Sequence, residues 1–150
     1  MVTRTTIRSG IGFSVTRILQ AIVDKRYVAA LQKGVKNEQR ARRLASHLHT
    51  KGLIPHDTSK EVYVTRKWSE MDMSGYDLII PTDLGDIGLQ IKSSFYGKKK
   101  FEERQRKKSY VRIRCIVVND KLTDAEIVEK IRRNCWREYN IMKEKMGRMY

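Results

Sequence analysis

Three polar side chains that could act together on a phosphate, those of Asp77, Gln90 and Lys92, lie in or beside two short apolar segments. Asp77 precedes the apolar run 78–80, and Gln90 and Lys92 lie two positions apart in a second run that follows a short polar bend. A strand turns successive side chains to opposite faces, so residues two apart share a face. Polar groups are costly to place among apolar neighbours, which suggests that they have a function. We expect the carboxylate to hold a divalent cation and the ammonium to lie near a reacting water or phosphate.

This segment resembles the motif of the PD-(D/E)XK nuclease superfamily, the restriction-endonuclease-like fold, in its variant with Gln for the second acid. In that family an Asp heads one strand, and Glu or Gln, one apolar residue and Lys follow on the next, as Asp77 and Gln90-Ile91-Lys92 do here. Ser often follows the Lys in resolvase-like members, as Ser93 does here. The resemblance, which extends to Holliday-junction-resolvase-like and homing or restriction-type members, implies a site for Mg²⁺ or Mn²⁺. Asp77, Gln90 and the Ile91 carbonyl would hold the cation, and Lys92 would act on the attacking water or the phosphate.

Gln90 stands where Glu is commoner in the family. An amide oxygen can ligate Mg²⁺ but brings no charge, so binding of the metal would depend more on the carboxylates and the Ile91 carbonyl. The first hypothesis is therefore a metal-dependent endonuclease that hydrolyses DNA phosphodiester bonds. The second is a catalytically inactive nucleic-acid-binding protein on the same fold. A basic adaptor or assembly subunit with an accidental motif is the third.

Glu38 is a further candidate ligand, because the helix before the sheet in the resembled family supplies a Glu toward the metal. Positions 38, 41, 45 and 48 share one face of a helix, so Glu38 lies on the same side as an apolar stripe. The other interpretation is a first-turn Glu that the helix dipole favours. Asp72 is the alternative to Asp77, but the apolar run directly after Asp77 favours the latter.

A strong excess of positive charge predicts a polyanionic partner. The chain of 150 residues carries 32 Lys and Arg against 17 Asp and Glu, a formal net charge of +15. Far less charge suffices for solubility, and no apolar run approaches the length of a membrane span. We expect DNA as the partner, with RNA as an alternative. The expected contacts are Ser93, Ser94, Lys98, Lys99, Lys100, Arg104, Arg106, Lys107 and Lys108. Phe95, Tyr96 and Tyr110 are candidates for stacking on bases.

Hydrophobic periodicity predicts an α/β chain with two parts. Residues 1–34 form a basic arm, irregular over 1–12 and then helical until Gly34, and residues 35–150 form the nuclease-like domain. In this domain we expect a helix over 36–50 that ends at Gly52, and strands near 61–65, 76–81, 87–93 and 110–118. The run 98–108 is a loop or short helix, and Thr123 with Glu126 predicts a capping box for a helix over 124–145. The resemblance implies a mixed four-stranded sheet flanked by helices over 35–145.

The remaining residues indicate no second chemistry. Cys115 and Cys135 lack metal-ligand spacing and are expected to be buried, reduced thiols, which suits a cytoplasmic or nucleoid-associated protein. The three histidines are expected at the surface. The first twenty residues are basic and lack acids, a composition that transit peptides share, although a basic arm is the favoured interpretation. A homodimer is expected, because cutting both strands of a duplex usually needs two sites.

Overall fold

The structure is a computed structural model that describes residues 2–67, 69, 75–108 and 113–150. For residues 2–19, 21–23 and 108 it describes the backbone alone. The chain divides into two compact units, Met1–Gly34 and Val35–Tyr150, so the break lies next to Gly34. The first unit is helical, and all strands of the described residues belong to the second unit.

Helix α1 extends over Val2–Thr50, and this corrects two predictions. Residues 2–12 are helical rather than irregular, and the helix does not end at Gly34 to restart near Lys36. A glycine inside a helix costs only about 1 kcal/mol relative to alanine, and no proline lies nearby to remove a hydrogen bond. Gly34 is therefore tolerated inside the helix.

The end of α1 near Gly52 was predicted correctly. Gly52 adopts a φ of 68°, which is the left-handed conformation that glycine enters at no steric cost. The Leu53 N–H donates to the Leu48 carbonyl at 3.0 Å and the Gly52 N–H donates to the His49 carbonyl at 3.1 Å. This pair of bonds is a Schellman motif, which satisfies the last carbonyls of the helix.

Four strands form one mixed sheet in the order β1-β2-β3-β4, and this confirms the predicted α/β class. They are β1 Tyr63–Val64, β2 Leu78–Thr82, β3 Gly85–Lys92 and β4 Arg114–Val117. β2 pairs antiparallel with both β1 and β3, whereas β3 and β4 are parallel. The first and last strands are shorter than predicted, and the predicted start of the last strand lies in 109–112, outside the described residues.

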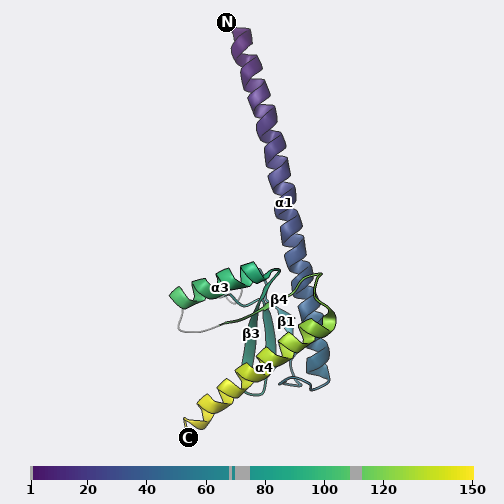
Figure 1. The fold of residues 1–150 in the computed structure, drawn as a ribbon, viewed down its shortest axis with the longest axis vertical. Coiled ribbons are helices and arrows are strands. Elements are labelled where there is room, and N and C mark those ends of the chain that lie inside the picture. The colour runs from purple at the N-terminus through teal and green to yellow at the C-terminus, as the bar shows by residue number, and fades with distance from the viewer. Residues whose placement is uncertain (1, 68, 70–74, 109–112) are drawn as a thin grey trace. The chain divides into compact units, whose positions relative to one another are not determined.

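Two further helices belong to the second unit within the described residues. The crossover between the parallel strands contains α3, Phe95–Lys108, so the basic run is helical. Ser94 caps it, because its Oγ accepts a hydrogen bond of 3.0 Å from the Gly97 N–H. Helix α4, Asp124–Gly147, runs across the strands (Figure 1). It begins with the predicted capping box of Thr123 and Glu126.

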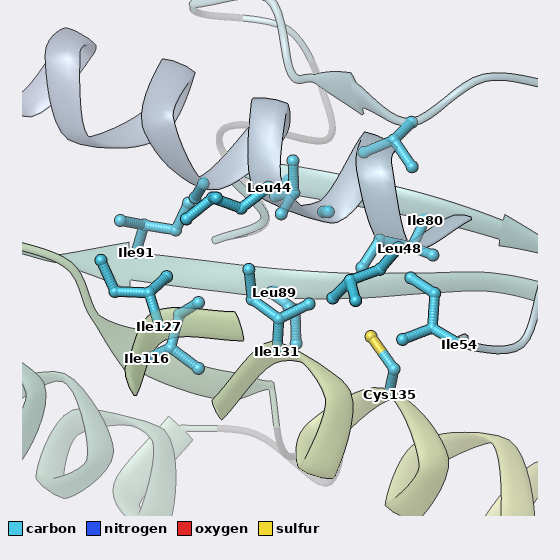
Figure 2. Close-up of a cluster of buried hydrophobic side chains, with 14 of the residues drawn as sticks. Leu44, Leu48, Ile54, Ile80, Leu89, Ile91, Ile116, Ile127, Ile131 and Cys135 are labelled. Carbon is cyan, nitrogen blue, oxygen red and sulfur yellow. The ribbon is translucent and has the colours of Figure 1, made fainter. Parts of the chain in front are cut away.

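The core lies on one face of the sheet. Leu44 and Leu48 of α1 and Ile127 and Ile131 of α4 pack with the strand side chains of that face, including Leu89 (Figure 2). The other face carries the alternate residues of the same strands, and α3 covers it with the buried Phe101. Cys115 and Cys135 are both buried and free, as predicted. Within the described residues, no helix is both long and apolar enough to span a membrane.

Candidate active site

Asp77 lies immediately before β2, next to the strand β3 that carries Gln90. The β2–β3 register ends with the pair Leu78 and Leu89. The Asp77 N–H donates to the Leu89 carbonyl at 2.9 Å, and the Asp77 carbonyl accepts from the Thr65 N–H at 2.9 Å. Backbone bonds on both sides thus fix the Cα of Asp77 before any side-chain interaction is counted.

The Asp77 carboxylate is buried and hydrogen-bonded through one oxygen. Its Oδ2 accepts from Gln90 Nε2 at 2.6 Å and from the Ile91 N–H at 2.8 Å, and Oδ1 makes neither bond. Asp77 and Gln90 are each only 6% exposed. The two side chains therefore form a connected, buried polar pair.

Burial raises the pKa of Asp77 from 3.8 to about 6. The hydrogen bond from Ile91 opposes this shift, the charge of Glu38 adds to it, and Lys67 and Lys92 lower the pKa. Near pH 6 the carboxyl group is therefore divided between its protonated and ionised forms. A strongly perturbed carboxyl group beside several charged residues is typical of a functional site.

Glu38 lies near the Asp77–Gln90 pair, although it comes from helix α1 at the start of the second unit. It belongs to α1, is only 8% exposed, and pairs through Oε1 with Lys67 Nζ at 3.0 Å. Its charge raises the pKa of Asp77, so the two carboxylates lie within each other's field. The structure thus brings together the two acids that the sequence proposed as metal ligands.

Lys92 lies on the same face as Gln90. The β3–β4 register pairs Gln90 with Cys115 and Lys92 with Val117, two steps along a parallel ladder. The Lys92 side chain is half-buried, and its Nζ lies 5.5 Å from the centre of the Phe101 ring. Its charge lowers the pKa of Asp77, so the ammonium acts on the same carboxylate. The Ile91 N–H donates a hydrogen bond to Asp77, and the Ile91 carbonyl stays a predicted ligand.

Ser93 and Ser94 have structural partners. The Ser93 Oγ accepts from Asn37 Nδ2 at 3.1 Å, and its carbonyl accepts from Asn119 Nδ2 at 3.0 Å. These bonds join α1, the end of β3 and the turn after β4 next to Lys92. Ser94 is exposed and caps α3. Their contact with nucleic acid stays a prediction.

Sequence reasoning missed Lys67 and Asn37. Lys67 comes from the polar segment after β1, where nothing in the pattern distinguishes it from neighbouring charged residues. Asn37 is 2% exposed and precedes Glu38, so the same helical turn contributes both. A buried Asn at the start of an apolar stripe was a usable signal, whereas the approach of Lys67 to Glu38 depends on tertiary structure alone.

The predicted basic contacts lie on α3. Lys99, Lys100, Arg104, Arg106 and Lys107 are exposed and Lys98 is half-buried. Lys108 is the last residue of the helix, and its side chain is not among those that the structure describes. The predicted residues Tyr110 and Asp72 also lie outside the described residues. Phe95 and Tyr96 are exposed, and the ammonium groups of Lys130 and Lys100 lie 5.0 and 5.2 Å from the respective ring centres. The first turn of α3 therefore presents aromatic rings within a cationic surface.

One histidine differs from its prediction. His49 is buried, and its Nε2 lies 3.0 Å from the Pro81 carbonyl, so it joins α1 to β2 rather than facing solvent. His47 is exposed, as expected, and His56 is half-buried with its ring edge-on to His49 at 5.9 Å. His49 lies one helical turn after the buried Ala45, on the same face of α1, which explains its burial.

Side chains alone do not complete a metal site in the described residues, where no group of three or more His, Cys, Asp and Glu is placed to hold an ion. A cation at Asp77 and Glu38 would therefore need neutral oxygens as well. Gln90 and the Ile91 carbonyl are of the required kind, since Mg²⁺ accepts carboxylate, amide and carbonyl oxygens together with water. The donor set is thus chemically suited to Mg²⁺ or Mn²⁺.

Comparison of the chain with protein-family models, with curated proteins and with solved structures gave no match. Its function is therefore inferred from the site itself: the buried Asp77–Gln90 pair, the neighbouring Glu38 and Lys67, and Lys92 on the same face. These residues come from α1, the segment after β1, the start of β2 and the end of β3.

Proposed function

We propose that the protein is an endonuclease that hydrolyses DNA phosphodiester bonds with Mg²⁺ or Mn²⁺, on a restriction-endonuclease-like core. The observation that carries the proposal is the hydrogen bond between Gln90 and a buried Asp77 whose pKa responds to Glu38 and Lys92. The charges of Glu38 and Lys92 and the hydrogen bond from Gln90 all act on Asp77, which supports a common site for the three motif residues and Glu38. A scattered arrangement would have favoured the adaptor hypothesis.

Glu38 and Asp77 would hold the cation, with the Gln90 amide oxygen and the Ile91 carbonyl completing the donor set. Gln90 uses its Nε2 toward Asp77, so Oε1 is the atom left for the cation. The bound metal would supply a polarised water and would neutralise charge that develops on the phosphate. Asp77 binds a cation best when ionised, a form that predominates above its pKa of about 6.

Lys92 would orient the attacking water or stabilise the phosphate oxygens in the transition state. Its ammonium lies 5.5 Å from the centre of the Phe101 ring, and its charge lowers the pKa of Asp77. Lys67 pairs with Glu38 in the metal-free protein, so its ammonium would lose this partner when a divalent cation binds.

The DNA would lie along the cationic surface of α3, next to the end of β3. The net charge of +15 and the exposed lysines and arginines of this helix support a polyanion as partner. The exposed Phe95 and Tyr96 would offer stacking surfaces to unpaired bases. A homodimer in the compartment that contains the DNA, cytoplasm or nucleoid, would allow both strands to be cut.

A cleavage assay tests this proposal. Supercoiled plasmid, a four-way junction, single-stranded DNA and RNA are each incubated with the protein in Mg²⁺, Mn²⁺ or EDTA. We expect cleavage of at least one DNA substrate with metal and none with EDTA or with Asp77→Ala. Asp86→Ala, which removes an exposed carboxylate from the β2–β3 hairpin, is the matched control and should cut normally. Equal cleavage by Asp77→Ala and wild type would show that the active site is elsewhere, and Asp72 would be tested next.

A binding protein without nuclease activity is the second candidate. Two observations favour it: Gln90 adds no charge to the site, and Glu38 already has a cationic partner in Lys67. Under this hypothesis wild type and Asp77→Ala both bind DNA tightly, and neither nicks any substrate in Mg²⁺ or Mn²⁺.

A further inference from the structure

A cationic cavity of about 260 Å³ lies between α3, β4 and α4. Four of its lining side chains are positively charged, Lys98, Arg106, Arg114 and Arg137, and one is negatively charged, Glu102. Bringing four cations to one cavity is unfavourable unless anions compensate them. The pairing of these charges therefore indicates what the cavity could bind.

Two of the four cations already have partners. Lys98 Nζ lies 3.8 Å from Glu102, and the Arg114 guanidinium donates to Glu138 of α4. Arg106 and Arg137 form no ion pair with any residue of the described ranges, and both are exposed. The cavity thus presents two guanidinium groups, from two different helices, that lack a counter-charge. Guanidinium is the side-chain group that best matches phosphate oxygens, through paired hydrogen bonds.

An uncharged amide supports the same chemistry. Gln105 Oε1 accepts from the Ile113 N–H at 3.4 Å, so the amide N–H groups of Gln105 remain for an acceptor in the cavity. Burial raises the pKa of the Cys115 thiol at the cavity wall to about 12, so this residue adds no negative charge at neutral pH. An anion in the cavity would therefore be surrounded mainly by hydrogen-bond donors and positive charges. Among the lining residues Glu102 would repel it, and the charge of Glu102 is offset by its ion pair with Lys98.

The cavity lies one strand away from the candidate active site. Cys115 of its wall pairs with Gln90 in the parallel β3–β4 ladder, so both side chains are on the α3 face of the sheet. Neighbouring strands are separated by about 4.8 Å. The charges of Lys92 and Asp77 also act on the pKa of Cys115, so the wall of the cavity lies within the electrostatic range of the candidate active site.

We propose that this cavity binds a phosphate group of the polynucleotide, close to the phosphate that is cut, and so sets the position of the strand. This inference rests on the proposed nuclease function for the identity of the ligand. The chemistry of the cavity, a phosphate bound by Arg106 and Arg137, is also that of a free phosphorylated molecule. The experiment below separates these two sources.

The test uses the full chain and the double variant Arg106→Gln/Arg137→Gln. The matched control is Arg133→Gln/Lys143→Gln, which removes two positive charges from exposed positions of α4 that lie outside the cavity and outside the expected DNA contacts. Pyrophosphate binding is measured by calorimetry at low salt, and binding of a fluorescent DNA duplex is measured in EDTA, where no cleavage occurs. Far-ultraviolet circular dichroism checks that both variants are folded.

We expect the cavity variant to bind both pyrophosphate and DNA at least about tenfold more weakly, a loss of about 1.4 kcal/mol, because it lacks two groups that form charge-assisted hydrogen bonds to phosphate. The control should lose no more than about threefold, because it removes only general electrostatic attraction. Equal losses in the two variants, or unchanged pyrophosphate binding in the cavity variant, would overturn the proposal. Loss of pyrophosphate binding with DNA affinity equal to that of the control would assign the cavity to a free phosphorylated ligand instead. If wild type bound pyrophosphate but no DNA, the nuclease function would fail while the phosphate chemistry stood.

Discussion

The Gln90 side-chain amide donates a hydrogen bond of 2.6 Å to Oδ2 of Asp77. Gln90 is a buried residue of β3, and Asp77 is the residue immediately before β2. The bond joins a neutral donor to a carboxylate that burial destabilises in its charged form. Gln90 therefore supports the ionised Asp77 without adding a second negative charge next to it. A Glu at this position would repel Asp77 whenever no cation was bound.

The raised pKa of Asp77 predicts that Asp77→Asn stabilises the metal-free protein at neutral pH. The folded state binds a proton near pH 6 and the unfolded state near 3.8, so the folded wild type loses stability as pH rises across this interval. Asparagine has no such dependence and can keep an oxygen toward the Ile91 N–H. Two pKa units correspond to about 3 kcal/mol, which is the upper limit of the gain above pH 7. The gain should disappear near pH 4.

Urea unfolding in EDTA at several pH values measures this effect. Asp86→Asn is the control, and as an exposed substitution it should stay within about 0.5 kcal/mol of wild type. A gain for Asp77→Asn that did not vary between pH 4 and pH 7 would contradict the assignment of the effect to burial of the charge.

Glu38 and Lys67 should shift the Asp77 titration in opposite directions. Glu38→Gln removes a negative charge that raises the pKa of Asp77, so the pKa should fall. Lys67→Gln removes a positive charge that lowers it, so the pKa should rise. Carboxyl ¹³C chemical shifts followed against pH in EDTA report both changes. Shifts of the same sign in the two variants would show that general loosening of the site, rather than charge, is responsible.

Lys67→Gln should also bind Mn²⁺ more tightly than wild type, because the cation no longer competes with an ammonium for Glu38. The Lys67 side chain is 54% exposed, so solvent screening limits the effect to roughly 0.2–1 kcal/mol. The control is Lys60→Gln, which removes the charge of another exposed lysine, just before β1. Mn²⁺ binding followed by electron paramagnetic resonance measures the difference, and weaker binding by Lys67→Gln would refute the competition.

Gln90→Glu should make the site more dependent on metal. Without metal, the new carboxylate faces Asp77 and destabilises the fold, while with Mg²⁺ or Mn²⁺ it adds a charged ligand. We expect a lower melting temperature in EDTA, a larger increase on adding Mn²⁺ than wild type shows, and roughly tenfold tighter Mn²⁺ binding. Gln90→Ala serves as the control for loss of the hydrogen bond to Asp77. Unchanged Mn²⁺ affinity in Gln90→Glu would place the cation away from Gln90.

DNA binding should weaken steeply with salt. If about six phosphates are neutralised by the surface of α3 and its neighbours, the logarithm of the binding constant should fall with a slope near −5 against the logarithm of the salt concentration. Fluorescence anisotropy in EDTA between low and physiological salt measures the slope. A flat response would exclude a polyanion as the partner that the +15 charge indicates.

Local patterns in the sequence determined much of this structure. Strand alternation placed Gln90 and Lys92 on one face, Gly52 marked the end of α1, and Thr123 with Glu126 marked the start of α4. Each of these features depends on residues within a few positions of one another, whose steric and hydrogen-bonding preferences the sequence displays directly.

Contacts between distant segments were decided only by the tertiary structure. The approach of Lys67 to Glu38, the bond from Asn37 to Ser93 and the burial of His49 against Pro81 all join residues from separate elements. The predicted helix break at Gly34 also failed, because one glycine costs less than the helix around it gains. Which side chains meet Asp77 depends on how α1 packs on the sheet, and packing is set by the summed burial of many residues rather than by any local pattern.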